Sequence, residues 1–132
     1  MDKIIIEPTK KTPKIIIDSD KYYIEIIGNS LPENVRDFYL PLIEKIKAVV
    51  DLWKKKFPDK VIFLIKLNYF NSSSTKFLFD MINTVITLKD TNIPINIDWY
   101  FEDGDDDLKE AGEELSEMLD YPFNYILIKS EN

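Results

Sequence analysis

The chain has 132 residues, 45% hydrophobic and 31% charged, which is the composition of one globular domain over residues 1–132. Its 24 acidic and 17 basic residues give a net charge of −7, which repels nucleic-acid phosphates and anionic lipids, so we expect no nucleic-acid or membrane partner. Histidine and cysteine are absent, which excludes Ser-His-Asp and Cys-His catalysis, thiolate metal sites and disulfides.

The first part of the chain contains three short runs rich in isoleucine, at residues 4–6, 15–17 and 22–27. Branched side chains of this kind favour strands, and the polar segments between the runs are typical of turns. A glycine, an asparagine and a serine at positions 28–30 are expected to end the third run. The sequence therefore begins with three predicted strands.

A long amphipathic helix is predicted next. Ser30 and Glu33 have the spacing of a capping box, in which a hydroxyl and a carboxylate satisfy backbone N–H groups at a helix start. Pro41 is expected to kink this helix or to divide it, because proline removes one backbone hydrogen bond. Apolar side chains recur every three or four residues, at Val35, Phe38, Tyr39, Leu42, Ile46, Val49 and Trp53.

Residues 61–70 are almost continuously apolar, which predicts a central strand covered on both faces. A second helical stripe follows at residues 77–85, and alternating apolar residues at 95–101 predict another strand. A third helical stripe at residues 108–119 precedes a predicted edge strand at 123–128. Together these elements predict an α/β fold, with a single mixed β-sheet of about five to six strands and three helices packed on it.

Four consecutive hydroxyl residues, Ser72, Ser73, Ser74 and Thr75, lie where the central strand gives way to the second helix. Asn71 before them is a good N-cap. N–H groups in the first turn of a helix lack partners within the helix, and the helix dipole favours negative charge there. A phosphoryl group on Ser72 would add about two negative charges where they are tolerated. This segment is therefore a candidate phosphorylation site.

Two other interpretations of the hydroxyl cluster stay open. Serine and threonine are common at helix starts, so the cluster could act only as a helix cap in a constitutive binding or scaffold module. An anion-binding site is the third possibility, although the segment has no glycine and Lys76 is its only base.

A partner-binding surface is expected beside the cluster. Tyr69, Phe70 and Tyr100 lie near the predicted ends of their strands, where exposed aromatic rings would favour protein binding. Asn71 and Lys76 complete the expected partner-binding set. Ordinary packing of the aromatic rings is the alternative.

The acidic turn at residues 102–107 also allows two interpretations. Carboxylates suit Ca²⁺ or Mg²⁺, but the position of the glycine does not match a calcium-binding loop. The alternative is a solvated helix start, with acids placed favourably on the helix dipole. We expect no metal, no cofactor and no enzymatic activity.

Several motifs follow one another in a specific order over nearly the whole chain. They are Glu7-Pro8-Thr9 with Thr12-Pro13, Gly28-Asn29-Ser30 leading to Pro32-Glu33-Asn34, Tyr69-Phe70-Asn71-Ser72-Ser73-Ser74 with Lys76, Asn96 with Trp99-Tyr100, Glu110-Ala111-Gly112-Glu113-Glu114, and Pro122-Phe123. Together they resemble the SiaC family of bacterial regulatory phosphoproteins, which is similar in fold to STAS-type anti-sigma factor antagonists.

The resemblance implies a phosphorylation cycle with a protein kinase and a PP2C-type phosphatase. In this cycle the unmodified protein binds and activates an effector. In the branch of the family that is named for SiaC, the effector is a diguanylate cyclase, so that the output is cyclic di-GMP. The acceptor implied is the residue directly after the asparagine of the motif, Ser72, where the family pattern has threonine. Ser73, Ser74 and Thr75 are the alternates. We expect a cytoplasmic protein, because no signal peptide or membrane span is evident.

Overall fold

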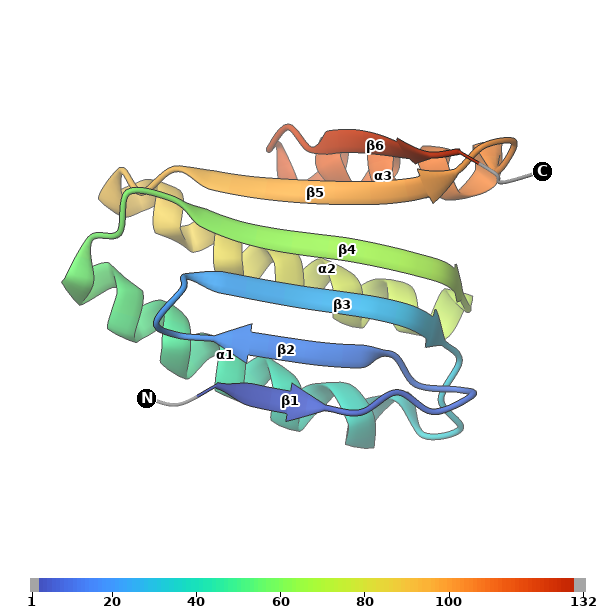
Figure 1. Cartoon of the computed structure of the whole chain (residues 1–132), viewed down its shortest axis with the longest axis horizontal. Coiled ribbons are helices and arrows are strands. Elements are labelled where there is room, and N and C mark those ends of the chain that lie inside the picture. The colour runs from blue at the N-terminus through green and yellow to red at the C-terminus, as the bar shows by residue number, and fades with distance from the viewer. Residues whose placement is uncertain (1–2, 130–132) are drawn as a thin grey trace.

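Six strands form one mixed β-sheet in the computed structural model, which describes residues 3–129 (Figure 1). The order of the strands across the sheet is their order in the chain: β1 (Ile4–Ile6), β2 (Lys14–Asp18), β3 (Tyr23–Ser30), β4 (Val61–Phe70), β5 (Ile95–Glu102) and β6 (Asn124–Ile128). The first three strands pair antiparallel, and β3 to β6 pair parallel. The predicted α/β fold with one mixed sheet is confirmed.

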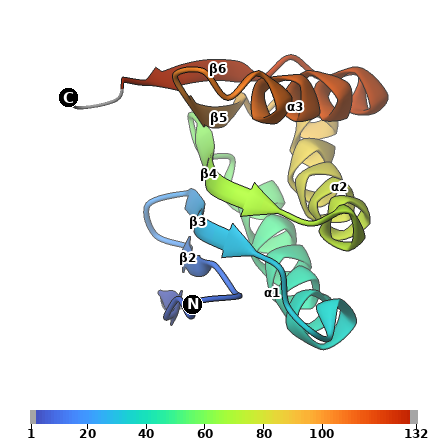
Figure 2. The ribbon, with the colours of Figure 1, turned by 90° about the vertical axis from the view of Figure 1, so that its right-hand side faces the viewer.

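Three helices connect the parallel strands. They are α1 (Val35–Lys56), α2 (Ser72–Ile86), which continues into the short 3₁₀ helix η1 (Thr87–Thr91), and α3 (Asp106–Leu119). All three lie on the same side of the sheet (Figure 2). The reason is the strand order, because the parallel strands follow one another across the sheet in the order of the chain. Crossover connections of the same handedness that all run in the same direction across a sheet place their helices on the same face. Within residues 3–129, no helix has the length and apolar character needed to cross a membrane.

The other face of the sheet carries no helix, so the prediction that β4 is covered on both faces is wrong. Val61, Phe63 and Ile65 of β4 are buried against the helices, whereas Ile62 and Leu64 between them are only half-buried. A continuous apolar run is typical of a strand between two helical layers. Here the uncovered face retains partly exposed apolar side chains instead.

Two expectations about α1 are corrected. Ser30 is not a helix cap but the last residue of β3, and its side chain is buried. The helix begins at Val35, with Asn34 as the N-cap that accepts a hydrogen bond from the Asp37 N–H. Pro41 does not divide the helix, which runs on to Lys56, and the alternative of a kink at Pro41 stays a prediction. Proline in the second turn removes one hydrogen bond, and the apolar stripe packed on the sheet maintains the helix.

The two tryptophans lie in the core between the sheet and the helices. Trp53 of α1 donates a hydrogen bond to the carbonyl of Ser19, and Trp99 of β5 donates to the carbonyl of Leu108 in α3. Gly112 of α3 passes so close to Trp99 that a Cβ atom at this position would lie 2.6 Å from the indole ring. Trp99 therefore fixes where α3 lies.

Candidate functional site

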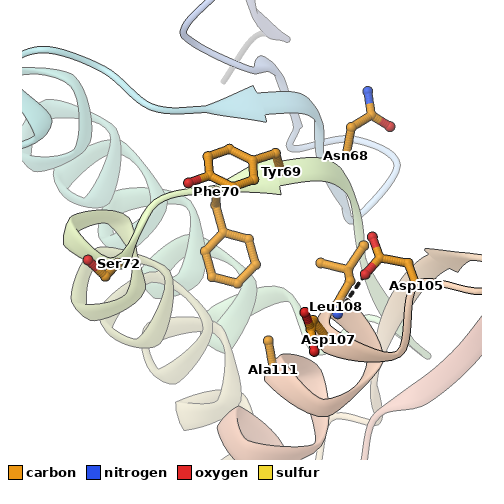
Figure 3. Close-up of a pocket in the computed structure, with 8 residues that line it drawn as sticks. All are labelled: Asn68, Tyr69, Phe70, Ser72, Asp105, Asp107, Leu108 and Ala111. Carbon is orange, nitrogen blue, oxygen red and sulfur yellow. Dashed lines mark hydrogen bonds between the residues drawn. The ribbon is translucent and has the colours of Figure 1, made fainter.

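The candidate site is a cavity at the edge of the sheet where the parallel strands end. The carboxyl ends of β4 and β5 and the first turns of α2 and α3 meet at this edge (Figure 1). The cavity has a volume of about 390 Å³ and is lined by Asn68, Tyr69, Phe70, Ser72, Asp105, Asp107, Leu108 and Ala111 (Figure 3).

A β-bulge at Asn68 sets the directions of the two aromatic rings. The pairing of β3 with β4 jumps from Gly28–Leu67 to Asn29–Tyr69, which leaves Asn68 as the extra residue. A bulge of this kind reverses the alternation of side chains beyond it. Phe70 therefore lies on the helix side, where its ring packs edge-on against Trp99 at a centroid distance of 6.2 Å.

Tyr69, by the same reversal, projects from the sheet edge and is 56% exposed. In Figure 3 the Phe70 ring extends between the first turns of α2 and α3, with Ser72 on one side and Ala111 on the other. The ring of Tyr69 lies above it. An exposed tyrosine over a half-buried phenylalanine is a combination typical of protein-binding surfaces.

Ser72 is the first residue of α2, is exposed to solvent, and is one of the residues that line the cavity. Asn71 caps the helix by accepting hydrogen bonds from the backbone N–H of Ser74, at 3.2 Å, and from the hydroxyls of Ser73 and Ser74. The hydroxyl of Ser72 makes no hydrogen bond to any residue within 3–129. The hydroxyls of Ser72, Ser73 and Ser74 thus differ sharply in their surroundings.

Ser74 belongs to a buried network that sequence reasoning missed. Its hydroxyl lies 2.9 Å from that of Ser30 and donates to the Asn71 side chain at 2.7 Å. Ser30 in turn shares a hydrogen bond with the hydroxyl of Tyr39 in α1. The backbone N–H of Asn71 also donates to the Ser30 carbonyl, at 3.0 Å. The network joins β3, α1 and the start of α2, and so holds the backbone beside Ser72 in place.

Ionisation of Tyr39 is predicted to make the free energy of unfolding depend on pH in the alkaline range. Burial raises the pKa of Tyr39 from 10.0 to about 12, although its hydrogen bonds with Ser30 and Ser74 lower it. Below pH 10.0 the Tyr39 hydroxyl is protonated in both the folded and the unfolded protein, so its contribution to stability is fully present. Between pH 10.0 and about 12 the hydroxyl ionises in the unfolded chain but stays protonated in the folded protein, which favours unfolding. Stability should therefore fall by about 1.4 kcal/mol per pH unit in this window on account of Tyr39.

The Tyr39→Phe variant isolates this effect. It removes the hydroxyl, so it should lose about 0.5–1.5 kcal/mol near neutral pH and show a shallower loss of stability above pH 10.0 than the parent. Tyr23 and Tyr125 also have raised pKa values. The parent and the Tyr39→Phe variant both contain these two tyrosines, so the difference between the two proteins reports on Tyr39. Urea unfolding over a series of alkaline pH values checks the prediction, and equal slopes in the two proteins would contradict it.

The acidic turn forms the start of α3, as its helix-start interpretation predicted. Asp105 is the N-cap, and its Oδ1 atom accepts a hydrogen bond of 3.0 Å from the Leu108 N–H. Asp106 and Asp107 lie in the first turn, where the helix dipole favours acids. No group of three or more potential metal-binding side chains occurs within the part of the chain that the structure describes.

Removal of the Asp105 cap is expected to destabilise the protein moderately. Asp105→Ala should lower the free energy of unfolding by about 1 kcal/mol, because the Leu108 N–H loses its acceptor. Asp106→Ala is the control, since Asp106 is exposed and does not provide the cap. Denaturant unfolding of both variants measures the difference, and an equal effect of the two changes would show that charge rather than capping is responsible.

The structure brings together some of the predicted site residues and separates others. Tyr69, Phe70 and Ser72 line the same cavity. Asn71 and Lys76 lie on the adjoining first turns of α2 but do not line it. Tyr100 follows the buried Trp99 in β5, so it faces the helix-free side of the sheet, away from this cavity. The role of Tyr100 in partner binding stays a prediction.

Comparison with known proteins gives consistent matches over almost the full length. The sequence profile of SiaC family regulatory phosphoproteins matches residues 6–128. An uncharacterized protein of Pseudomonas aeruginosa (strain UCBPP-PA14) is 24% identical over 123 residues, which cover 93% of this chain and 94% of that protein.

Solved structures share the fold. The crystal structure of apo-SiaC from Pseudomonas aeruginosa is similar with a TM-score of 0.81 at 22% identity, over 96% of this chain and 99% of that one. A chain in the crystal structure of the diguanylate cyclase SiaD in complex with its activator SiaC, from the same species, gives a TM-score of 0.83 at 22% identity, over 95% and 99% of the two chains.

Proposed function

The chain belongs to the SiaC family of regulatory phosphoproteins, and on this premise we propose that phosphorylation of Ser72 controls its binding to an effector protein. In the unmodified state the edge that contains the cavity binds the effector. In the phosphorylated state a dianion in the cavity wall disrupts that contact. A protein kinase adds the phosphate, and a PP2C-type phosphatase removes it. The chain acts as one regulatory domain in the cytoplasm and carries out no catalysis itself.

The observation that carries this proposal is the contrast among the hydroxyls of Ser72, Ser73 and Ser74. Ser74 is buried in the network with Ser30, and Ser73 donates to Asn71. Ser72 is exposed, without a hydrogen bond to any described residue, and lies in the wall of the cavity. A kinase needs an accessible hydroxyl, and a switch needs that hydroxyl at the surface which the partner contacts. Ser72 has both properties.

The start of α2 would tolerate the phosphate. Ser72 is the first helical residue, next to backbone N–H groups with no partner inside the helix. These groups and the helix dipole stabilise a negative charge at this position. Lys76 follows four residues later in the helix, a spacing at which side chains of opposite charge attract each other. Modification would therefore change the surface without unfolding the helix.

We propose a diguanylate cyclase as the effector. The support is the solved complex in which SiaC of Pseudomonas aeruginosa is the activator of the diguanylate cyclase SiaD, together with the shared fold. Binding of the unmodified chain would raise the synthesis of cyclic di-GMP, and phosphorylation would lower it. Tyr69 and Phe70 would supply the aromatic part of the contact.

A constitutive scaffold is the second candidate function, and the capping bonds of the cluster favour it. Asn71 accepts from both Ser73 and Ser74, so these two residues have a structural role. Capping does not account for Ser72, whose hydroxyl takes no part in the bonds around Asn71. The two candidates therefore differ in what modification of Ser72 does.

Phosphopeptide mapping of the chain from its own organism tests the proposal. Trypsin cleaves after Lys66 and Lys76, so one peptide of residues 67–76 contains all four hydroxyls and fragmentation can assign the phosphate. We expect phosphate on Ser72 when the kinase is active, and its loss after treatment with a PP2C-type phosphatase. A peptide that is never modified while the kinase is active would favour the constitutive scaffold.

A further inference from the structure

We propose that the cavity beside Ser72 is a docking pocket for one basic side chain of the partner, arginine in preference to lysine. This inference depends on the proposed function in one respect, that the partner binds at this edge of the sheet. It adds the chemistry of the contact, which neither the family nor the candidate phosphorylation site specifies.

The lining of the cavity has an apolar part and an acidic part. Phe70, Leu108 and Ala111 provide the apolar part, and Asp105 and Asp107 provide two carboxylates in the first turn of α3 and at its cap. None of the eight lining residues is basic. A volume of about 390 Å³ is at the small end of the range for ligand sites, which suits a single long side chain.

Both carboxylates are available to an incoming cation. Asp107 is exposed and forms no ion pair with any residue between 3 and 129. Asp105 uses its Oδ1 atom to cap α3, which leaves Oδ2 for a further contact. With a net charge of −7, the chain as a whole also attracts a basic partner surface.

Arginine fits this combination better than other side chains. Its aliphatic stem can pack on Phe70 and Leu108 while its charged end reaches the carboxylates of α3. Its planar guanidinium can also stack on the exposed ring of Tyr69 and form paired hydrogen bonds with a carboxylate, which lysine cannot do. A purely apolar side chain would leave the two carboxylates unpaired at the interface.

The pocket also gives a physical route for the switch. A phosphate on Ser72 would be repelled by Asp105 and Asp107, so it would remain at the mouth of the cavity. There it would bind the incoming guanidinium through strong charge-assisted hydrogen bonds before the side chain could enter. The cation would then be held at the mouth, and the partner could not seat against Phe70.

Peptide titrations of the unmodified full chain test the inference. The probes are four blocked pentapeptides, Gly-Gly-Xaa-Gly-Gly, in which the central residue is arginine, lysine, leucine or glutamate. In ¹H–¹⁵N correlation spectra, the arginine peptide should cause saturable shifts confined to the amides of Tyr69, Phe70, Leu108 and Ala111. Lysine should bind more weakly at the same amides, and leucine and glutamate should cause no comparable shifts.

Matched variants locate the contact. Asp107→Asn should weaken arginine binding by about threefold or more, whereas Glu110→Gln, an exposed acid on the same helix outside the cavity, should not change it. Equal binding of the leucine peptide, shifts spread over other acidic surfaces, or no binding of arginine would each overturn the inference. Because no phosphate is involved, such a failure is distinct from a negative phosphopeptide map, which would count against the switch.

Discussion

Replacement of Ser72 by aspartate is expected to weaken binding of the proposed effector, a diguanylate cyclase, by at least about tenfold, a loss of about 1.4 kcal/mol. The added carboxylate lies in the cavity wall, where an interface fitted to a neutral hydroxyl would have to desolvate a new charge beside Asp105 and Asp107. Ser72→Ala should leave affinity within about twofold, because the hydroxyl forms no hydrogen bond to any described residue and Asn71 provides the cap.

Ser73→Asp is the matched control for this experiment. It adds the same charge one residue further along the same exposed turn, but Ser73 does not line the cavity. We expect a loss of affinity well below that of Ser72→Asp, measured by calorimetric titration of each variant into the cyclase of the same organism. Equal losses for the two aspartate variants would show that total charge, rather than the position of Ser72, controls binding.

The Gly112→Ala variant is expected to lose about 1–3 kcal/mol of stability. Helix propensity alone predicts the opposite, a gain of about 1 kcal/mol for alanine over glycine inside a helix. The new methyl group would lie 2.6–2.7 Å from three atoms of the Trp99 ring, which is packed in the core. Either the ring or α3 must move, and movement of α3 would also lengthen the hydrogen bond from Trp99 to the Leu108 carbonyl.

Urea unfolding measures this effect against a matched control. Glu113→Ala changes the next residue of α3, which is exposed, and should remain within about 0.5 kcal/mol of the parent. Because Leu108 and Ala111 line the cavity, Gly112→Ala should also shift their amide resonances. A variant as stable as the parent, with these resonances unchanged, would refute the assignment of Gly112 as the close contact between α3 and the sheet.

The sequence was most informative where local signals agreed. The apolar run at residues 61–70 and Asn71 after it predicted both the limits of β4 and the cap of α2, because a strand pattern met a strong N-cap. The start of α1 was missed, because Ser30 and Asn34 are both good caps by sequence. Only the buried contact of Ser30 with Tyr39 and Ser74 decides between them, and it depends on residues far apart in the chain.

The geometry of the candidate site was predicted only in part. The hydroxyl cluster and Tyr69 were located from local sequence, but the cavity depends on residues of α3 that lie more than thirty positions away. The bulge at Asn68 has no local signal such as a glycine, so the directions of Tyr69 and Phe70 could not be predicted. Tyr100 was grouped with them because it lies near the same end of its strand, although alternation with the buried Trp99 places it on the opposite face of the sheet.

The most direct test of the switch compares two forms of the same chain, one unmodified and one with phosphoserine incorporated at position 72. Each is titrated into the proposed effector, a diguanylate cyclase of the same organism, and the dissociation constant and the rate of cyclic di-GMP synthesis are recorded. The unmodified chain should bind at least about tenfold more tightly and activate synthesis, and treatment with the phosphatase should restore the modified chain. Equal affinity and equal activation by the two forms would contradict the proposal that the charge at Ser72 governs partner binding.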